Sequence, residues 1–578
     1  AISLALLLLV LVTFEHRAPP PHPGPAAAAR GPRPVAMLRA VLHCSPGLEA
    51  TVQRECEAFK VKALIGTSGR LRATVTAKQL FKLNLFLRTA DRVVIDNIVR
   101  FKATTFSDLE LALKRLRREK LGEWLSDGVE VDVKSVVNKC QLFHTGAIEE
   151  RARKFLAAPK AKGRPRDLTM VRHASGELSH VLAEAPGAAP PKHVVHLEGS
   201  DDWFTVALDT SGAPLHHRGW RDDAAKMPLK STHAAAILLN AGWASPHKGY
   251  LVDPFCGSGS IAIEAAQMAV GLPPHFLHDG SRRRFAFEDF NCVDGSEWIE
   301  EWAEALEHVE DRAKSALKYA AAPSAPVRIF ASDRDEGAIH ATRNNAKRAG
   351  VGLLVEAAHG AISNLEAPKR DSAEAQLPCL LLTNPPWGLR SANGAPASGD
   401  APVDLQMRSL YQRFGTVFTE KFDGRGPAPI GETTPRRERQ RRRYRPPSHS
   451  LMRRRRWSLG VLVNNLNLSK LVLPDLDSNC EISIGGHRTW LSTRLKAELP
   501  KSTRLKAVAP KAAPKAAAKK ADPVKAAVKK AATKAKAAAS KAKKAAAARS
   551  ASARPAASSN VDASSASARS AASSASAR

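Results

Sequence analysis

The spacing of hydrophobic residues divides the chain into regions with different expected structures. From residue 37 onward, alternating segments such as "GRLRATVT" predict strands, and segments such as "SDLELALKRL" predict amphipathic helices. Their mixed order through residue 215 is typical of an α+β domain. Residues 158–192 are rich in Pro, Ala and Gly with weak periodicity, so we expect a loop insertion within this domain.

The pattern changes in residues 216–490, where short apolar segments alternate with long helical ones. "GYLVD", "VRIFASD" and "PCLLLTN" are apolar segments of this kind. Strands that are apolar on both sides belong to a parallel sheet covered by helices on both faces. We therefore predict an α/β fold with a mostly parallel, Rossmann-like sheet. An Arg-rich stretch at residues 425–456 interrupts the pattern and is either a basic insertion or a retained intron.

The two ends of the chain differ from its centre. Residues 1–36 contain the apolar run "AISLALLLLVLVTF", shorter than the roughly 20 residues that span a bilayer, followed by an Ala-, Pro- and Arg-rich stretch. This pattern favours a signal sequence and transit-like segment, and hence a plastid protein with no membrane association in its mature form. If the segment is instead upstream sequence included by mistake, the cytoplasm or nucleus is the alternative. Residues 491–578 are dominated by Lys, Ala, Pro and Ser, so we expect a disordered basic tail.

Charge and cysteine content narrow the possible partners. The formal net charge of +32 is concentrated in residues 425–456 and 501–578, and the remainder is close to balanced. Such segments attract polyanions such as RNA without reading sequence. The seven cysteines are scattered without a CxxC pair, which indicates neither a disulfide framework nor a zinc site, and we expect no metal.

A glycine-rich turn, "YLVDPFCGSGS", follows one predicted strand. Asp253 lies at the strand end, where doubly wound sheets bind ligands. Gly257 and Gly259 let the backbone approach a ligand closely, and the next helix offers free N–H groups to an anion, such as the carboxylate of S-adenosylmethionine. Such a turn can equally serve tight packing alone.

Two carboxylates end the next predicted strand, "VRIFASDRD". A carboxylate at this edge can accept hydrogen bonds from the hydroxyls of a ribose, and we assign Asp333 to that role. Asp335 can instead cap the following helix at Gly337.

The segment "LPCLLLTNPPWGLR" ends a third strand in a cluster of acceptors. The Asn384 side-chain oxygen and the Pro385 carbonyl can accept both hydrogens of a planar exocyclic amine, and the face of Trp387 can stack on its base. Accepting both hydrogens makes the amine nitrogen a better nucleophile toward a sulfonium methyl. An isolated Asn-Pro-Pro is more often a turn, but the upstream glycine turn favours a catalytic corner.

Together these motifs resemble a known family. "DPFCGSG" and "NPPWGLR", with "LDTSGAPLHHRGWR", "PLKSTHAAAILLNAGW", "RRRFAFEDF" and "ASDRDEGAIHATRNNAKRAGV", are similar to the THUMP-containing RNA guanine-N2 methyltransferases, above all the bacterial-type group acting on large-subunit (23S) ribosomal RNA. The resemblance covers residues 38–490 apart from the insertions. It implies a class I methyltransferase domain preceded by a THUMP-type RNA-binding domain in residues 37–215.

The resemblance also implies roles for individual residues. The methyl-acceptor site would consist of Asn384, Pro385, Pro386 and Trp387. S-adenosylmethionine would be bound by Asp253, Pro254, Cys256, Gly257, Ser258, Gly259, Asp333 and His359, and RNA by Arg88, Lys134, His144 and Thr145. Trp387 stands where the family more often has Tyr or Phe, and His359 where it usually has an Asp facing the adenine.

Three functions remain open on this basis. The first is methylation of the guanine N2 amine in ribosomal RNA, the second is the same chemistry on transfer RNA, and the third is a non-catalytic RNA-binding or assembly protein that keeps the fold. The target nucleotide and the oligomeric state are not indicated by the sequence.

Overall fold

The computed structural model describes residues 37–125, 130–156, 170–172, 178–180, 192–221, 228–243, 249–292, 297–322, 327–369, 377–388, 405–423 and 457–495, all within one unit, residues 1–507. The expected targeting segment, the Arg-rich stretch, most of the 158–192 insertion and nearly all of the tail lie outside these ranges. Within them, no helix is long and apolar enough to span a membrane. The same ranges contain no cluster of three or more His, Cys, Asp or Glu side chains that could hold a metal ion.

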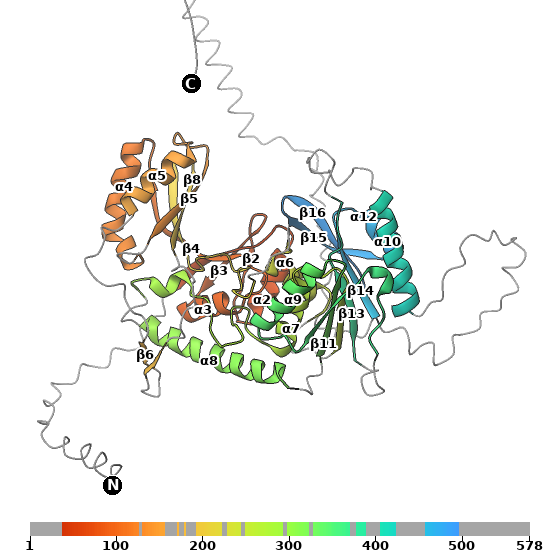
Figure 1. Ribbon diagram of the computed structural model, residues 1–578. Helices are drawn as coiled ribbons and strands as arrows, with labels where there is room; N and C mark the ends of the chain where they lie inside the picture. Colours follow the sequence, from red (N-terminus) through yellow and green to blue (C-terminus); the bar gives the residue numbers. More distant parts are fainter. Residues whose placement is uncertain are drawn as a thin grey trace, which may run out of the picture. The chain divides into compact units, whose positions relative to one another are not determined.

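The amino-terminal half forms a seven-stranded sheet in the order β2-β3-β1-β4-β9-β8-β5 (Figure 1). Its strands are β1 (Leu38–His43), β2 (Leu64–Ile65), β3 (Arg70–Val75), β4 (Arg92–Lys102), β5 (Val131–Asn138), β8 (His193–Ser200) and β9 (Trp203–Asp209). Its helices are α2 (Glu49–Glu57), α3 (Ala77–Phe86), α4 (Phe106–Glu119) and α5 (Thr145–Leu156), with a 3-10 turn η1 (Leu121–Glu123). Only β5 and β8 pair in parallel, so the expected α+β class is confirmed.

Local sequence explains where these elements begin and bend. Thr76 and Thr105 form capping boxes that satisfy free backbone N–H groups at the starts of α3 and α4. In β4, Asn97 takes a positive φ of 53° where the pairing with β9 shifts register. Such a bulge bends a strand, and beyond it β4 continues to pair with β9 as far as Lys102.

The carboxyl-terminal half forms a second seven-stranded sheet, in the order β12-β11-β10-β13-β14-β16-β15. Its strands are β10 (Gly249–Asp253), β11 (Val327–Asp333), β12 (Val355–His359), β13 (Cys379–Thr383), β14 (Trp457–Val463), β15 (Asp477–Ile484) and β16 (His487–Arg494). Its helices are α6 (Ser231–Asn240), α7 (Ser260–Val270), α8 (Glu297–Ala320), α9 (Glu336–Arg348), α10 (Leu405–Val417) and α12 (Leu466–Val472), with 3-10 turns η2 (Ala286–Asp289) and η3 (Ile362–Asn364) and a π-helical turn η5 (Phe418–Phe422). Within this sheet β16 alone runs in the opposite direction to the other strands, which confirms the mostly parallel sheet.

The apolar strands of this sheet are buried on both faces. Leu251, Leu380 and Leu382 pack into the core that contains α6, α7 and α9, whereas Val252 and Leu381 pack on the other face with α10 and α12 (Figure 1). The first of these cores continues without interruption into the amino-terminal sheet. Burial on both faces is the physical reason for the continuous apolar runs in the sequence.

Two boundaries differ from the sequence-based expectation. Within the insertion, β6 (Met170–Arg172) and β7 (Leu178–His180) pair as an antiparallel hairpin, so it is not entirely loop. The second sheet continues to Arg494, because the end of β16 pairs with β14, and the tail therefore starts later than residue 491.

Candidate active site

The glycine turn connects the buried end of β10 to α7, and its two glycines have different surroundings. Both take positive φ, 54° at Gly257 and 89° at Gly259. A Cβ added at Gly259 would lie 3.0 Å from the side chains of Ile263 and Thr342, whereas one at Gly257 would meet nothing within 4 Å. Gly259 therefore allows close packing, and Gly257 leaves open space over the turn.

Neighbouring elements fix this turn in place. The Gly257 amide donates to Asp333 Oδ2 at 3.0 Å, and its carbonyl accepts from the Thr342 hydroxyl at 2.8 Å. The Cys256 amide donates to the Ser332 carbonyl of β11, and the Asn345 side chain donates to the Ser258 carbonyl. Burial raises the pKa of the Cys256 thiol, so this group packs as a neutral side chain.

Asp253 is a buried carboxyl with one oxygen in use. Thr383 Oγ1 donates to its Oδ1 at 2.6 Å, whereas Oδ2 is buried with no hydrogen-bond partner in the described part of the chain. Burial raises the pKa of Asp253 to about 7 against the opposing hydrogen bonds from Thr383 and the Phe255 amide, and nearby Asp333 raises it further. A cation placed beside Oδ2 would stabilise the ionised form.

Two further carboxylates, Asp333 and Asp335, lie at and just after the end of β11. Asp335 accepts from the Gly337 amide at 2.9 Å and caps α9, as its alternative reading predicted. Asp333 is half-buried, and besides Gly257 it accepts from the Asp335 amide. His359 pairs with Asp333 in the β11–β12 register and is exposed at the same edge, with Nε2 3.0 Å from the Arg334 carbonyl.

The Asn-Pro-Pro-Trp corner follows β13 directly beside β10. Asn384 Oδ1 is buried and, among the residues described, has no hydrogen-bond partner. Trp387 is half-buried and its Nε1 donates to the Leu462 carbonyl of β14 at 3.3 Å, while Tyr411 donates to the Pro386 carbonyl at 3.2 Å. Pro385 is buried and Pro386 exposed. The corner is therefore anchored from both sides and keeps one strong acceptor free for a substrate.

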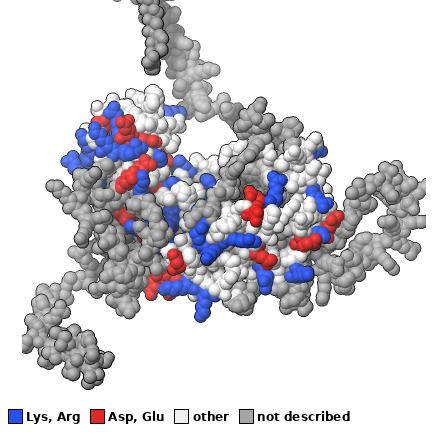
Figure 2. All heavy atoms as spheres, viewed as in Figure 1, with Lys and Arg blue, Asp and Glu red and all other residues white. Residues whose placement is uncertain are grey.

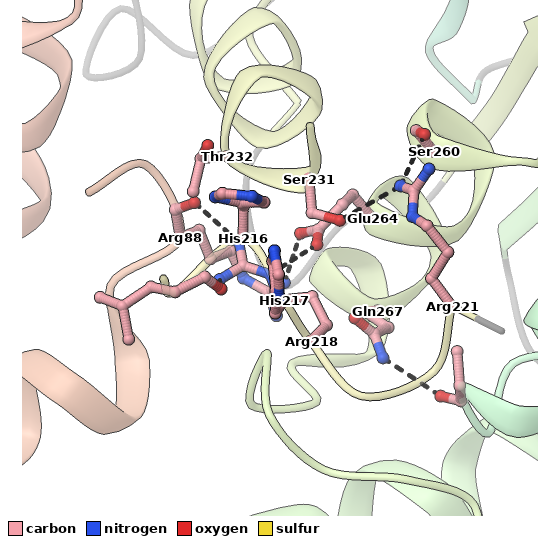
Figure 3. A network of polar contacts seen from close by, with 12 residues as sticks. Arg88, His216, His217, Arg218, Arg221, Ser231, Thr232, Ser260, Glu264 and Gln267 are labelled. Atoms are coloured by element: carbon pink, nitrogen blue, oxygen red, sulfur yellow. Dashed lines mark hydrogen bonds and ion pairs between the residues drawn. The ribbon is translucent and has the colours of Figure 1, made fainter. Parts of the chain in front are cut away.

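The sequence reasoning missed a cation that holds the glycine turn. Arg221 donates to the hydroxyl of Ser260 at 2.8 Å (Figure 3). It also donates to the hydroxyl of Ser258 at 3.2 Å and to the Leu229 carbonyl at 3.2 Å. Burial lowers the pKa of Arg221 to about 10, so it remains charged at neutral pH. Its only signal in the sequence is its place at the end of "RGWR".

Arg88 does not have the expected role. The structure buries it against the second domain, where it donates to Glu264 at 2.9 Å and also to the Leu272 carbonyl. Glu264 is fully buried on α7 and also accepts from Arg218 at 2.9 Å (Figure 3). The assignment of Arg88 to RNA binding is wrong, because its side chain is buried and its guanidinium group is paired with Glu264 of α7.

The other proposed RNA contacts are accessible. Lys134 is largely exposed on β5, and its Nζ lies 3.3 Å from Asp132 Oδ2. His144 and Thr145 are exposed at the start of α5. Figure 2 shows basic and acidic side chains intermixed over α4 and α5, and pairs such as Arg115 with Glu119 account for part of this mixture. These three residues remain predictions.

Comparison with known proteins agrees with this geometry. Residues 218–434 match the family described as RMKL-like, methyltransferase domain, and residues 39–94 match the RlmL ferredoxin-like domain. The chain is 28% identical over 414 residues to the ribosomal RNA large subunit methyltransferase K/L of Psychrobacter cryohalolentis, covering 68% of this chain and 49% of that protein. It is 29% identical over 374 residues to the putative RNA methyltransferase YpsC of Bacillus subtilis, covering 64% and 82%.

Solved structures share the fold. A possible methylase from Clostridium difficile superposes with a TM-score of 0.56 at 20% identity, covering 81% of this chain and all of the other. SMU.472, a putative methyltransferase complexed with SAH, superposes with a TM-score of 0.55 at 22% identity, covering 80% and 99%. The fold, together with the glycine turn after β10 and the Asn-Pro-Pro-Trp corner after β13, thus defines a methyltransferase-type α/β domain joined to a ferredoxin-like domain.

These matches assign two parts of the chain: residues 218–434 are similar to an RMKL-like methyltransferase domain, and residues 39–94 to an RlmL ferredoxin-like domain. The chain spans about half the length of the curated K/L relatives it matches.

Proposed function

We propose that this protein is an S-adenosylmethionine-dependent RNA methyltransferase that transfers a methyl group to the exocyclic N2 amine of a guanine in large-subunit ribosomal RNA. The observation that carries the proposal is the buried Asn384 Oδ1, which lacks a partner within the described residues and lies one strand away from the open glycine turn. A buried acceptor without a partner costs about 1–3 kcal/mol, which is offset when a substrate donor fills the site.

The residues around the turn fit the cofactor. The open space at Gly257 can admit a ligand against bare backbone, and the free N–H groups at the start of α7 suit its carboxylate. The unused oxygen of Asp253 suits its ammonium group, and Asp333 retains lone pairs for ribose hydroxyls. When bound, S-adenosylmethionine supplies an electrophilic methyl group on a positively charged sulfur.

The corner residues would prepare the amine. Asn384 Oδ1 and the Pro385 carbonyl accept the two amine hydrogens and direct the nitrogen lone pair out of the base plane, toward the glycine turn. Trp387, whose indole is held by its bond to Leu462, would stack on the base, a contact worth about 1–3 kcal/mol. A neutral amine needs no strong base for this step, because the proton can leave after the methyl group has arrived.

The choice of ribosomal RNA is supported by the relatives named as ribosomal RNA large subunit methyltransferases. Transfer RNA is the alternative, because the name of the relative YpsC, a putative RNA methyltransferase, does not specify which class of RNA it acts on. We propose that residues 37–215 act as a THUMP-type RNA-capture domain with Lys134, His144 and Thr145 at its surface. Localisation in a plastid remains a proposal that rests on residues 1–36, and a fluorescent fusion of that segment tests it.

The proposal is tested with the full chain, labelled S-adenosylmethionine and unmodified large-subunit ribosomal RNA or transfer RNA. We expect N2-methylguanosine in the ribosomal RNA digest, identified by mass spectrometry, and at least a 100-fold lower rate with Asn384→Ala. Asn467→Ala, an exposed amide on α12, is the matched control and keeps the wild-type rate. Product only in transfer RNA would support the second function. Cofactor binding without methylation of either RNA would support the non-catalytic alternative.

A further inference from the structure

Three adjacent strands of the second sheet end in buried oxygen atoms that lack a hydrogen-bond partner in the part of the chain described. They are Asp253 Oδ2 on β10, Asn384 Oδ1 after β13 and Asn464 Oδ1 after β14. The first two belong to the cofactor and amine positions discussed above. Asn464 belongs to neither of these positions, and it is not part of any motif found in the sequence.

Asn464 follows β14 as Asn384 follows β13, and it lies two residues beyond Leu462, the position that the strand register brings opposite Asn384. Each is the first residue after its strand, and β13 and β14 pair in parallel with Thr383 opposite Val461. Leu382 and Leu462 both pack into the same core, on the face that also receives Trp387. Because side chains alternate along a strand, continuing this pattern places Asn384 and Asn464 on that face.

The corner itself connects the two asparagines. Trp387 donates to the carbonyl of Leu462, two residues before Asn464, so the indole crosses from the end of β13 to the end of β14. Neighbouring strands lie about 4.8 Å apart, and successive residues on one face about 6.6 Å apart. Two side-chain amides at this spacing can reach different atoms of one purine.

Asn464 is 7% exposed, and no hydrogen bond to its side chain is found within the described residues. Its neighbour Asn465, in contrast, uses its side chain to cap α12 through the Asn467 amide at 2.9 Å. Capping by Asn465 satisfies the helix start and leaves Asn464 without a structural task. Burying an amide without a partner is unfavourable, so a ligand is the natural source of the missing donor.

We propose that Asn464 is a specificity-determining residue whose Oδ1 accepts the N1–H of the target guanine, while Asn384 accepts its 2-amine. This inference rests on the proposed function and names how the same site selects its base. Guanine carries adjacent donors at N1 and the 2-amine. Adenine lacks both donors. 2-Aminopurine keeps the 2-amine for Asn384, but its unprotonated N1 would place a lone pair against the buried Asn464 oxygen and leave that acceptor unsatisfied.

The test compares Asn464→Leu, which removes the acceptor at similar size, with Asn464→Asp, which keeps it. We expect Asn464→Leu to lower kcat/KM for guanine in ribosomal RNA by about 10- to 100-fold, and Asn464→Asp to retain more activity than the Leu variant. Asn467→Leu serves as the exposed control and should match the wild type. S-adenosylhomocysteine binding should be similar in all four proteins, and Asn464→Leu should unfold at no lower temperature than the wild type, because it removes a buried amide without a partner.

A second readout does not depend on methyl transfer. Saturation-transfer NMR with S-adenosylhomocysteine-loaded protein measures binding of GMP and of 2-aminopurine ribonucleoside monophosphate. The wild type should prefer GMP, and Asn464→Leu should lose that preference.

Equal binding of the two nucleotides by the wild type, no GMP signal, or identical behaviour of the Leu and Asp variants would overturn the assignment. If the wild type methylates guanine and Asn464→Leu does so equally well, only this inference fails; absence of methylation of any RNA would contradict the proposed function itself.

Discussion

At the residue scale, Asp253 links proton binding to stability. Burial raises the pKa of Asp253 from 3.8 to about 7. Because the folded chain keeps a proton that the unfolded chain has already lost, its free energy of unfolding should fall as pH rises from about 4 to about 7, and then level off. Asp253→Asn should remove this contribution. Urea unfolding from pH 5 to pH 8 measures it, and Asp311→Asn on the exposed surface of α8 should leave the wild-type slope unchanged.

The same carboxyl predicts how cofactor affinity depends on pH. A cationic ligand binds more tightly to the ionised form, so the affinity of the wild type for S-adenosylmethionine should increase as pH rises through about 7. Calorimetric titrations at pH 6 and pH 8 test this expectation. Equal affinity at the two pH values would show that Asp253 does not contact the cation.

Gly257 offers a second residue-scale prediction with a closely matched control. Gly257→Ala places a methyl group in the open space over the turn and strains a left-handed backbone by about 1–2 kcal/mol. Gly280→Ala adds a methyl group at a φ of 81° that also meets nothing within 4 Å. Both variants should lose similar stability, but only Gly257→Ala should lose at least 10-fold in S-adenosylhomocysteine affinity. A loss of affinity in both would mean that backbone strain, and not occupied space, is responsible.

At the element scale, α7 joins the two halves of the protein. Its amino-terminal end carries the glycine turn, and its buried Glu264 accepts from Arg88 of the first half and from Arg218. Arg221 ties the start of the same helix to the Leu229 carbonyl. Helix α7 therefore borders the candidate site and also carries the ion pair that anchors it to Arg88 of the amino-terminal domain.

Breaking this anchor should be costly. Glu264→Gln leaves two buried guanidinium groups without their counter-ion, and we expect a loss of about 3–5 kcal/mol in the free energy of unfolding. Arg115→Ala removes an exposed ion pair with Glu119 on α4 and should cost less than about 0.5 kcal/mol. Chemical denaturation measures both, and comparable losses would contradict the role given to the buried cluster.

At the scale of the whole molecule, most of the net positive charge belongs to residues 425–456 and 501–578, which lie outside the described ranges. Deletion of residues 501–578 should lower RNA affinity and flatten its dependence on salt, because fewer phosphate-bound counterions are released. Cofactor binding should not change. Filter binding at 50 and 200 mM salt measures the effect, and an unaltered salt dependence would exclude a role for this segment in RNA binding.

The sequence predicted those parts of the protein that depend on local pattern. The apolar strands, the two classes of domain and the motifs at the ends of β10 and β13 all follow from nearby residues. Arg88 was misjudged because its burial depends on Glu264, far along the chain, which periodicity cannot reveal. Asn464 escaped notice for the same reason, since only the pairing of β14 with β13 brings the end of β14 to the same edge of the sheet as Asn384.

The shared core and the Arg88–Glu264 pair also limit how this architecture can be recombined. Replacing residues 37–215 with the corresponding module of another protein would leave Glu264 with one of its two cations, unless the donor supplies an arginine just after the helix that corresponds to α3. A successful chimera must therefore transfer this ionic contact together with the module.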